Sequence, residues 1–356
     1  MATPAERYAK SRADQAYPHL GAFRGLYDFA LDEFQIEACR AVEDGHGVLV
    51  AAPTGSGKTL VGEFAVHMAL ATGRKCFYTT PIKALSNQKF ADFVSRYGAE
   101  NVGLLTGDNT INGEAPVVVM TTEVLRNMLY AGSHTLGGLG FVVMDEVHYL
   151  ADRMRGAVWE EVIIHLPESV SVISLSATVS NAEEFGDWLT EVRGDTVTIV
   201  EERRPVPLHQ HVLVGRKLFP LFESGSEGDG TQVNRALERI AREDWQQSRM
   251  SRGRPGKGSH RPRSRHRTPG RAELVERLDS EGLLPAIAFV FSRAGCAAAV
   301  QQCLDARLTL TTPEEQAEIG AVVDATCSHL PEEDLHVLGF YEFREALVRG
   351  IAAHHA

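Results

Sequence analysis

The sequence predicts an α/β protein in which a parallel sheet is covered by helices on both faces and is followed by an incomplete second domain of the same kind. Between about residue 20 and residue 200, short β-branched apolar runs alternate with helix-length segments, a pattern typical of strands buried on both faces. Polar motifs stand directly after several of these runs, at the carboxyl edge where parallel sheets bind ligands. A chain of 356 residues has room for two domains.

The expected strands of the first domain are short apolar runs that end at a turn or at a polar residue. They cover residues 48–52, 76–80, 102–105, 117–121, 141–145 and 170–176. Helices are expected between them, over residues 58–71, 82–96, 122–130 and 181–189. Parallel strands need crossover connections of this length, so the alternation predicts a single parallel sheet.

The pattern changes after residue 200, where we expect a connector. Residues 203–207 are extended and rich in Pro, residues 208–214 alternate like an edge strand, and residues 232–246 could form a helix. Residues 249–271 contain nine Lys or Arg residues and no acidic residue. A tract so rich in Arg, Gly, Ser and Pro cannot build a core and is predicted to be disordered. It either binds nucleic acid electrostatically or is a solvated linker.

A second α/β pattern begins after the basic tract. It consists of a helix over 272–278, a strand over 286–291 and a helix over 295–306, followed by further helical sequence. One strand is too few for a complete second sheet. The sequence therefore predicts four regions, which are an N-terminal extension (1–24), a first α/β domain (25–205), a connector (206–271) and the N-terminal part of a second α/β domain (272–356).

Composition and charge favour a soluble, cytoplasmic protein that does not hold nucleic acid by its overall charge. The formal net charge is −11, and 44% of the residues are hydrophobic, which is ordinary for a globular protein. The five cysteines form no CxxC pair, as expected for reduced thiols. The N-terminus lacks the apolar core of a signal peptide, and the longest apolar runs have only the length of a strand, so no membrane association is expected.

The segment from Ala52 to Thr59 reads Ala-Pro-Thr-Gly-Ser-Gly-Lys-Thr and stands between an expected strand and an expected helix. A loop of the form [Gly/Ala]-x-x-x-x-Gly-Lys-[Ser/Thr] in this position wraps phosphates with backbone N–H groups at a helix N-terminus. We expect Lys58 to reach the β- and γ-phosphates of ATP and the Thr59 hydroxyl to bind Mg²⁺. The candidate ATP-binding residues of this loop are Ala52, Pro53, Thr54, Gly55, Ser56, Gly57, Lys58 and Thr59.

A pair of carboxylates, Asp145 and Glu146, follows the apolar run Phe-Val-Val-Met. Asp145 is expected to hold the Mg²⁺, partly through water, and Glu146 to orient and deprotonate the attacking water. His148 is either a hydrogen-bonded structural histidine or a relay between the nucleotide and neighbouring polar groups. Ser176 and Thr178 follow another strand and are either a helix cap or hydroxyls that couple the site to the rest of the molecule. The candidate catalytic residues are Glu146, Asp145, Lys58 and His148.

Taken in order, these motifs resemble those of the superfamily 2 DExH-box helicases, most closely the Ski/Mtr-type RNA helicases and their bacterial HelY-like relatives. The matching segments are 52–59 (motif I), 80–89 (motif Ia), 121–126 (motif Ib), 145–148 (motif II), 176–178 (motif III) and 289–293 (motif IV). The resemblance implies two RecA-like domains with ATP and Mg²⁺ between them, residues 25–205 being the ATP-binding domain. It also implies that Gln35 reads the adenine edge, with Tyr27 or Phe29 packing on the base.

The same resemblance implies a groove that tracks single-stranded or partly duplex RNA, or DNA as in some relatives. The residues implied in gripping the sugar-phosphate backbone are Pro81, Lys83, Gly107, Thr121, Thr122 and Arg126. Such contacts use backbone N–H groups, hydroxyls and a few cations, and they do not read sequence. For Lys83 and Arg126 the alternative is a solvated helix face, and for Thr121 and Thr122 it is a helix cap. The sequence does not indicate protein partners.

Two later motifs of the family, one of which carries the arginine fingers, have no match in residues 272–356. In related NTPases such an arginine contributes about 10³–10⁵ in rate. We therefore expect the N-terminal part of a longer helicase, able to bind ATP and single strands but poor at unwinding. Two alternatives stay open, a DNA helicase of the same superfamily acting in repair and a non-motor module that binds ATP or RNA without turnover.

Overall fold

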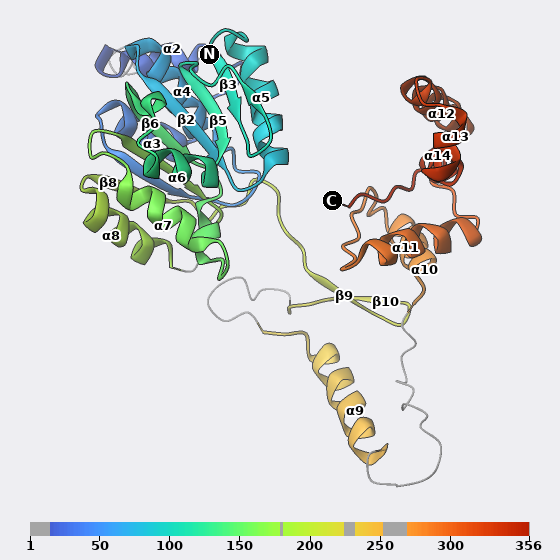
Figure 1. The fold of residues 1–356 in the computed structure, drawn as a ribbon. Helices are drawn as coiled ribbons and strands as arrows, with labels where there is room; N and C mark the ends of the chain where they lie inside the picture. The colour runs from blue at the N-terminus through green and yellow to red at the C-terminus, as the bar shows by residue number, and fades with distance from the viewer. Residues whose placement is uncertain (1–14, 179–180, 224–231, 252–268, 356) are drawn as a thin grey trace, which may run out of the picture. The chain divides into compact units, whose positions relative to one another are not determined.

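The computed structural model describes residues 15–178, 181–223, 232–251 and 269–355 (Figure 1). The chain divides into two compact units, Met1–Leu208 and His209–Ala356. No helix in the described part of the chain is both long enough and apolar enough to cross a membrane.

The first unit is built on one eight-stranded sheet with the strand order β4-β3-β5-β2-β6-β7-β1-β8. Neighbouring strands run parallel, except that the short edge strand β4 is antiparallel to β3. The strands are β1 (Gly47–Ala51), β2 (Lys75–Thr80), β3 (Val102–Leu105), β4 (Thr110–Ile111), β5 (Val117–Thr121), β6 (Leu139–Met144), β7 (Ser171–Ser176) and β8 (Thr196–Val200). The predicted parallel α/β sheet is thus confirmed.

Helices cover both faces of this sheet, and the core consists of two clusters. Because successive strand residues point to opposite faces, Val48 and Val50 of β1 pack in one cluster and Leu49 in the other. The first cluster contains Phe23 and Phe64, and the second is closed by helices that follow β5, β6 and β7. The helices are α2 (Pro18–Arg24), α3 (Glu33–Glu43), α4 (Thr59–Thr72), α5 (Lys83–Tyr97), α6 (Thr122–Tyr130), α7 (Gly156–His165) and α8 (Ala182–Arg193), with short 3₁₀ helices η1 (His134–Leu136) and η2 (Val147–Ala151).

Several elements of the first unit were not predicted, among them α2, α3, α7 and β8. Leu20 and Phe23 of α2 are buried in the first core cluster, so residues 18–24 pack with the sheet domain, although we expected them in an N-terminal extension. The short helix α2 was not predicted because its two buried residues are too few to form a recognisable helical periodicity.

The second unit contains a two-stranded antiparallel hairpin and a series of helices. Its elements are β9 (His211–Val214), β10 (Lys217–Pro220), α9 (Arg235–Ser251), α10 (Arg271–Ser280), α11 (Arg293–Asp305), α12 (Pro313–Cys327), α13 (Glu332–Val337) and α14 (Phe340–Val348). The strand predicted over 286–291 is wrong, because these residues form no regular structure. Apart from the half-buried Val290, their apolar side chains are exposed instead, as no described strand lies beside them to complete the backbone hydrogen bonds.

The basic tract lies largely outside the described residues. Helix α9 continues to Ser251 and α10 begins at Arg271, so both ends of the predicted disordered tract 249–271 are helical. The remainder, residues 252–268, lies outside the described part of the chain.

Candidate nucleotide and nucleic-acid site

The strand order brings three of the predicted motifs together at one edge of the sheet. Strands β6, β7 and β1 are neighbours, and their carboxyl ends lead into Asp145, Ser176 and Ala52 respectively. Ala51 is paired with Ser176 in the strand register, and the N–H of Ala52 donates to the carbonyl of Ser176 at 3.1 Å. The glycine loop and the acidic pair are thus separated by one intervening strand, or two strand spacings of about 5 Å each.

The loop after β1 has the backbone geometry of a phosphate cradle. Gly55 and Gly57 adopt φ values of +86° and +82°, which L-residues with a side chain rarely adopt. A Cβ at Gly57 would lie 2.7 Å from Nε2 of Gln35, whereas a Cβ at Gly55 would meet nothing within 4 Å. The loop runs directly into α4, a helix of 14 residues, whose N-terminal N–H groups and dipole favour an anion.

Two side chains of the loop also fit a phosphate ligand. Lys58 is only 6% exposed, although a lysine is rarely buried without an anionic partner. The Oγ of Ser56 is fully buried and finds no hydrogen-bond partner among the described residues. Buried polar groups are nearly always satisfied, so the unpaired Ser56 hydroxyl marks a donor that the loop itself does not use.

Gln35 lies beneath this loop. Its Nε2 donates to the carbonyls of Ser56 at 3.4 Å and Gly57 at 3.1 Å, and its Oε1 accepts from the N–H of Asp32 at 2.9 Å. Both ends of the amide therefore have protein partners in this structure, and pairing with adenine would require Gln35 to exchange them. Tyr27 and Phe29 contact each other with ring centroids 5.1 Å apart, and Phe29 is exposed.

Asp145 is held in a mostly buried position directly after β6. The hydroxyl of Tyr78 on β2 donates to Oδ2 of Asp145 at 2.9 Å, and the N–H of Glu146 donates to Oδ1 at 3.0 Å. Burial raises the pKa of the Asp145 carboxyl, the hydrogen bond from Tyr78 lowers it, and the neighbouring Glu146 raises it again. A cation bound here would favour the ionised form.

Glu146 and His148 form a polar link towards β7. Glu146 adopts the left-handed conformation with φ +54°, which is strained for a residue with a side chain and is common at functional sites. Its Oε2 lies 3.2 Å from Nδ1 of His148, and the same nitrogen accepts from the N–H of Ala177 at 3.4 Å. Because one ring nitrogen cannot accept from Ala177 and donate to Glu146 at once, the tautomer of His148 decides which contact is a hydrogen bond.

The hydroxyls of Ser176, the last residue of β7, and of Thr178 differ in their surroundings. Ser176 is 1% exposed and its Oγ has no hydrogen-bond partner among the described residues. Thr178 is exposed. The structure therefore places Ser176 beside the glycine loop, as the register with Ala51 shows, while Thr178 faces solvent.

The donor set fits a magnesium–nucleotide complex better than a permanent metal cage. In the part of the chain that the structure describes, no group of three or more His, Cys, Asp or Glu residues is arranged to hold a metal ion. Mg²⁺ is usually bound by one or two carboxylates together with substrate phosphates and water. Thr59 at the start of α4 and Asp145 at the end of β6 provide protein oxygens of this kind.

The residues implied in strand binding occupy the other half of the same sheet edge. They lie at or after the carboxyl ends of β2, β3 and β5, which are neighbours in the order β3-β5-β2. Pro81, Thr121 and Thr122 are buried, and Gly107 is exposed with open space where a Cβ would stand. Thr121 and Thr122 could therefore offer mainly their backbone, although Oγ1 of Thr122 is buried without a partner among the described residues.

The two cations of this set already have acidic neighbours. Nζ of Lys83 lies 2.9 Å from Oδ1 of Asp108, and Nε of Arg126 lies 3.7 Å from Oε2 of Glu161. The hydrogen bond with Lys83 lowers the pKa of Asp108. A phosphate would have to compete with these carboxylates, so the local field is weaker than the two cations alone suggest.

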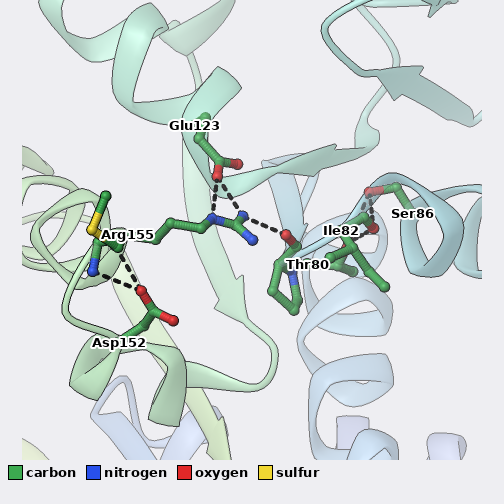
Figure 2. A network of polar contacts seen from close by, with 8 residues as sticks. Thr80, Ile82, Ser86, Glu123, Asp152 and Arg155 are labelled. Atoms are coloured by element: carbon green, nitrogen blue, oxygen red, sulfur yellow. Dashed lines mark hydrogen bonds and ion pairs between the residues drawn. The ribbon is translucent and has the colours of Figure 1, made fainter. Parts of the chain in front are cut away.

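Two residues of this region were missed by sequence reasoning, namely Tyr78 and Arg155. Arg155 donates to the carbonyl of Pro81 and to the carboxylate of Glu123, and so joins the loop after β2 to the first turn of α6 (Figure 2). In the sequence, Tyr78 is one residue of an apolar strand. Its role could have been suspected only because a buried tyrosine hydroxyl usually needs a hydrogen-bond partner. Arg155 belongs to a charged surface run with no signal of its own.

The glycine loop that opens α4 and the carboxylate pair that follows β6, at one edge of a parallel sheet, define a P-loop nucleotide-binding domain. Residues 32–185 match the family model described as "DEAD/DEAH box helicase". The resemblance drawn from the motifs is thus confirmed.

Similar proteins of known sequence point the same way. The chain is 62% identical over 349 residues to "Probable helicase HelY" of Mycobacterium tuberculosis, covering 95% of this chain. It is 40% identical over 369 residues to "DExH-box ATP-dependent RNA helicase DExH15 chloroplastic" of Arabidopsis thaliana and 35% identical over 378 residues to "Antiviral helicase SKI2" of Saccharomyces cerevisiae. These matches cover 93% and 92% of this chain respectively.

The chain spans only part of these relatives, namely 37% of the mycobacterial protein, 30% of the plant protein and 29% of the yeast protein. Among solved structures, the crystal structure of the DUF1998 helicase MrfA is similar with a TM-score of 0.52 and 18% identity, over 85% of this chain and 44% of that one. At this identity the similarity concerns the fold alone.

Proposed function

We propose that this chain carries the ATP-hydrolysing part of a nucleic-acid helicase and that its strand is RNA. The observation that supports this most is that the ATP motifs and the implied strand contacts occupy two adjoining halves of one sheet edge. The ATP motifs follow β6, β7 and β1, the implied strand contacts follow β3, β5 and β2, and the two halves meet where β2 pairs with β6. A nucleotide and a strand bound on this edge would contact loops of neighbouring strands.

On the nucleotide side, each residue has a role that its position allows. Lys58 and the N–H groups at the start of α4 bind the β- and γ-phosphates. The Thr59 hydroxyl and the Asp145 carboxylate would hold Mg²⁺, which neutralises charge on the phosphates when bound. Glu146 orients the water and takes its proton. His148 contacts both Glu146 and Ala177 and so acts as a relay towards Ser176 and Thr178.

On the strand side, the buried or small residues Pro81, Gly107, Thr121 and Thr122 act mainly through the backbone. Lys83 and Arg126 supply the charge, once a phosphate replaces their carboxylate partners. Contacts of this kind bind any sequence, and they need a locally favourable groove, so the net charge of −11 is no obstacle.

RNA is proposed as the strand because the plant relative is named an ATP-dependent RNA helicase, whereas the mycobacterial relative is named only a probable helicase. DNA is the alternative. We also propose a cytoplasmic location, since the cysteines are unpaired and buried or half-buried, as in proteins of a reducing compartment.

The proposal is tested by titrating the chain with a fluorescent ATP analogue in the presence of Mg²⁺, and with single-stranded RNA and DNA of one sequence. We expect the analogue to bind, RNA to bind more tightly than DNA, and ATP hydrolysis to rise when RNA is added. Absence of nucleotide binding would overturn the ATP site. Hydrolysis unaffected by either strand would favour a module that binds ATP without motor function, and stronger stimulation by DNA would replace RNA by DNA.

A further inference from the structure

The segment that follows the acidic pair ends in Arg155, whose guanidinium reaches the loop after β2 and the first turn of α6 (Figure 2). Its Nε and Nη2 donate to Oε1 of Glu123 at 3.1 Å and 2.5 Å, and Nη2 also donates to the carbonyl oxygen of Pro81 at 2.6 Å. Its Cζ lies 5.5 Å from the ring centroid of Trp159 on α7, which keeps the side chain over that helix. One guanidinium thus binds α6, the loop after β2 and α7.

Both partners belong to the proposed strand-binding edge. Pro81 stands between β2 and α5, and Glu123 lies in the first turn of α6, next to Thr121 and Thr122. The Arg155–Glu123 pair is about one-third exposed on each side, and an ion pair so exposed contributes little stability by itself. Its geometry matters more, because the planar fork of an arginine fixes the directions of two acceptors at once.

The loop at Pro81 is also fixed from its other side. Oγ1 of Thr80 donates to the carbonyl of Ile82 at 3.0 Å and lies 2.7 Å from Oγ of Ser86 (Figure 2). The contacts of Thr80 and Ser86 therefore hold the backbone at Ile82, whereas the carbonyl of Pro81 is held by Arg155. Without Arg155, the Pro81 loop would keep the contacts at Ile82 and lose the hydrogen bond to the Pro81 carbonyl.

The backbone of Arg155 is itself well fixed. Oδ1 of Asp152 accepts from the N–H groups of Met154 at 2.8 Å and Arg155 at 2.9 Å, an arrangement in which an aspartate closes a turn with its own side chain. The carbonyl of Asp152 accepts from the N–H of Gly156 at 2.8 Å. The side chain of Arg155 is therefore presented from a closed turn.

This turn is continuous with the segment that carries the acidic pair. Helix η2 begins at Val147, directly after Glu146, and ends at Ala151. It meets α7 at Gly156, where a Cβ would lie only 2.0 Å from the carbonyl oxygen of Leu150, so the two helices approach without an intervening side chain. Glu146 and Arg155 thus stand at opposite ends of one short, closely packed segment.

We propose that Arg155 is a positioning residue that fixes the Pro81 loop and the first turn of α6 relative to each other and to the segment that carries Glu146. This inference rests on the proposed function, because the Pro81 loop and the start of α6 carry proposed strand contacts. A strand that shifts either segment would move Arg155 and, through η2, the position of Glu146. Occupancy of the strand groove and the geometry of the water-activating carboxylate are thereby coupled.

The test uses the whole chain with Arg155→Ala, Arg155→Lys and, as a matched control, Arg153→Ala. Arg153 is exposed and lies two residues away, so its removal changes the net charge equally. We expect both Arg155 variants to bind a fluorescent oligouridine strand about tenfold more weakly, because lysine keeps the charge but not the fork. Affinity for a fluorescent ATP analogue should change by less than about twofold, and Arg153→Ala should leave both affinities within about twofold of the wild type.

A second measurement does not depend on strand binding. Amide hydrogen exchange at Ile82, Lys83 and the first turn of α6 should be faster in Arg155→Ala than in the wild type, and unchanged in Arg153→Ala. Glu123→Gln should weaken strand binding as well, and its combination with Arg155→Ala should be clearly less than additive, since both remove the same bridge.

The outcomes separate the inference from the function on which it rests. A wild-type chain that binds no strand refutes the proposed function, and the exchange data then decide the inference alone. Arg155→Ala with wild-type exchange overturns the positioning role in either case. Wild-type strand affinity in Arg155→Lys would also overturn it, because charge alone would then account for the effect of Arg155.

Discussion

Similar apolar runs form buried strands in the first unit of this chain and an exposed irregular segment in the second. In the first unit, the residues of β5 and β6 are buried without exception, as each strand has a neighbour on both sides. In the second unit, the apolar run over 286–291 forms no strand, and Ile287, Phe289 and Phe291 are 83%, 86% and 103% exposed. All three runs have the composition of a buried parallel strand.

The difference shows that an apolar run forms a buried strand only where other parts of the chain provide the adjacent strands and the covering helices. A strand of a parallel sheet is stabilised by the backbone hydrogen bonds of adjacent strands and by helices on both faces. The first unit provides eight strands in one sheet, whereas the second provides one hairpin among its described residues. Buried hydrophobic residues are correspondingly few in the described part of this unit, namely Cys303, Leu304, Leu308, Val323 and Ala346.

The largest expected effect concerns stability. Phe77 on β2 is fully buried in the second core cluster, while Phe289 is 86% exposed. Phe77→Ala should lower the free energy of unfolding by about 3–5 kcal/mol, because it leaves a cavity, whereas Phe289→Ala should change it by less than about 0.5 kcal/mol. Urea unfolding followed by far-ultraviolet circular dichroism and by tryptophan fluorescence measures both. Comparable losses in the two variants would mean that residue 289 is packed in solution.

The comparison also shows which parts of the fold could be predicted. The six strands and four helices predicted in the first unit rely on local patterns that the tertiary structure reinforces, and they form. Helix α2 and strand β8 were missed because they are short and their burial depends on distant partners such as α4 and β1. The strand over 286–291 was predicted from the same local pattern and is absent, since its neighbours are not determined by its own residues.

The next largest effect separates chemistry from binding within the first unit. Glu146→Gln should lower single-turnover ATP hydrolysis by about 10²–10⁴, because an amide cannot take the proton of the attacking water. Affinity for an ATP analogue should stay within about threefold, as Glu146 is not expected to hold phosphate or metal. Glu345→Gln in the second unit, where Glu345 pairs with Arg349, is the matched control. Equal loss of binding and hydrolysis in Glu146→Gln would contradict the assigned role.

A smaller effect is expected when a single cation is removed from each unit. Lys58→Ala should weaken binding of the ATP analogue by about 10- to 100-fold, since it removes a charge-assisted contact to phosphate. Arg344 in the second unit is paired with Asp324, and Arg344→Ala should leave this affinity unchanged within about twofold. Isothermal titration calorimetry in the presence of Mg²⁺ measures both variants. A similar loss in both would place nucleotide contacts in the second unit as well.

The candidate site could be predicted where a residue acts alone at the end of a strand and not where it acts through another residue. Lys58, Asp145 and Ser176 come together because the carboxyl ends of parallel strands share one edge, a property that the motifs imply. Arg155 could not be found in this way, since its partners are distant in sequence, Pro81 in the loop after β2 and Glu123 in α6. Such side chains are identified only when the packing of several loops is known.

The smallest effect concerns the hydroxyl of Tyr78, which sequence reasoning also missed. Tyr78 is fully buried and donates to Oδ2 of Asp145, and burial raises the pKa of Tyr78 well above its usual range, so the hydroxyl stays a donor at neutral pH. Tyr78→Phe should lower the free energy of unfolding by about 1–2 kcal/mol, because it leaves a buried carboxylate oxygen with one partner fewer. Tyr341 in the second unit is 57% exposed, and Tyr341→Phe should change stability by less than about 0.5 kcal/mol. Urea unfolding without nucleotide measures both. Equal stability of Tyr78→Phe and the wild type would show that water replaces the lost hydroxyl. That would contradict the burial of the Asp145 side chain in the structure.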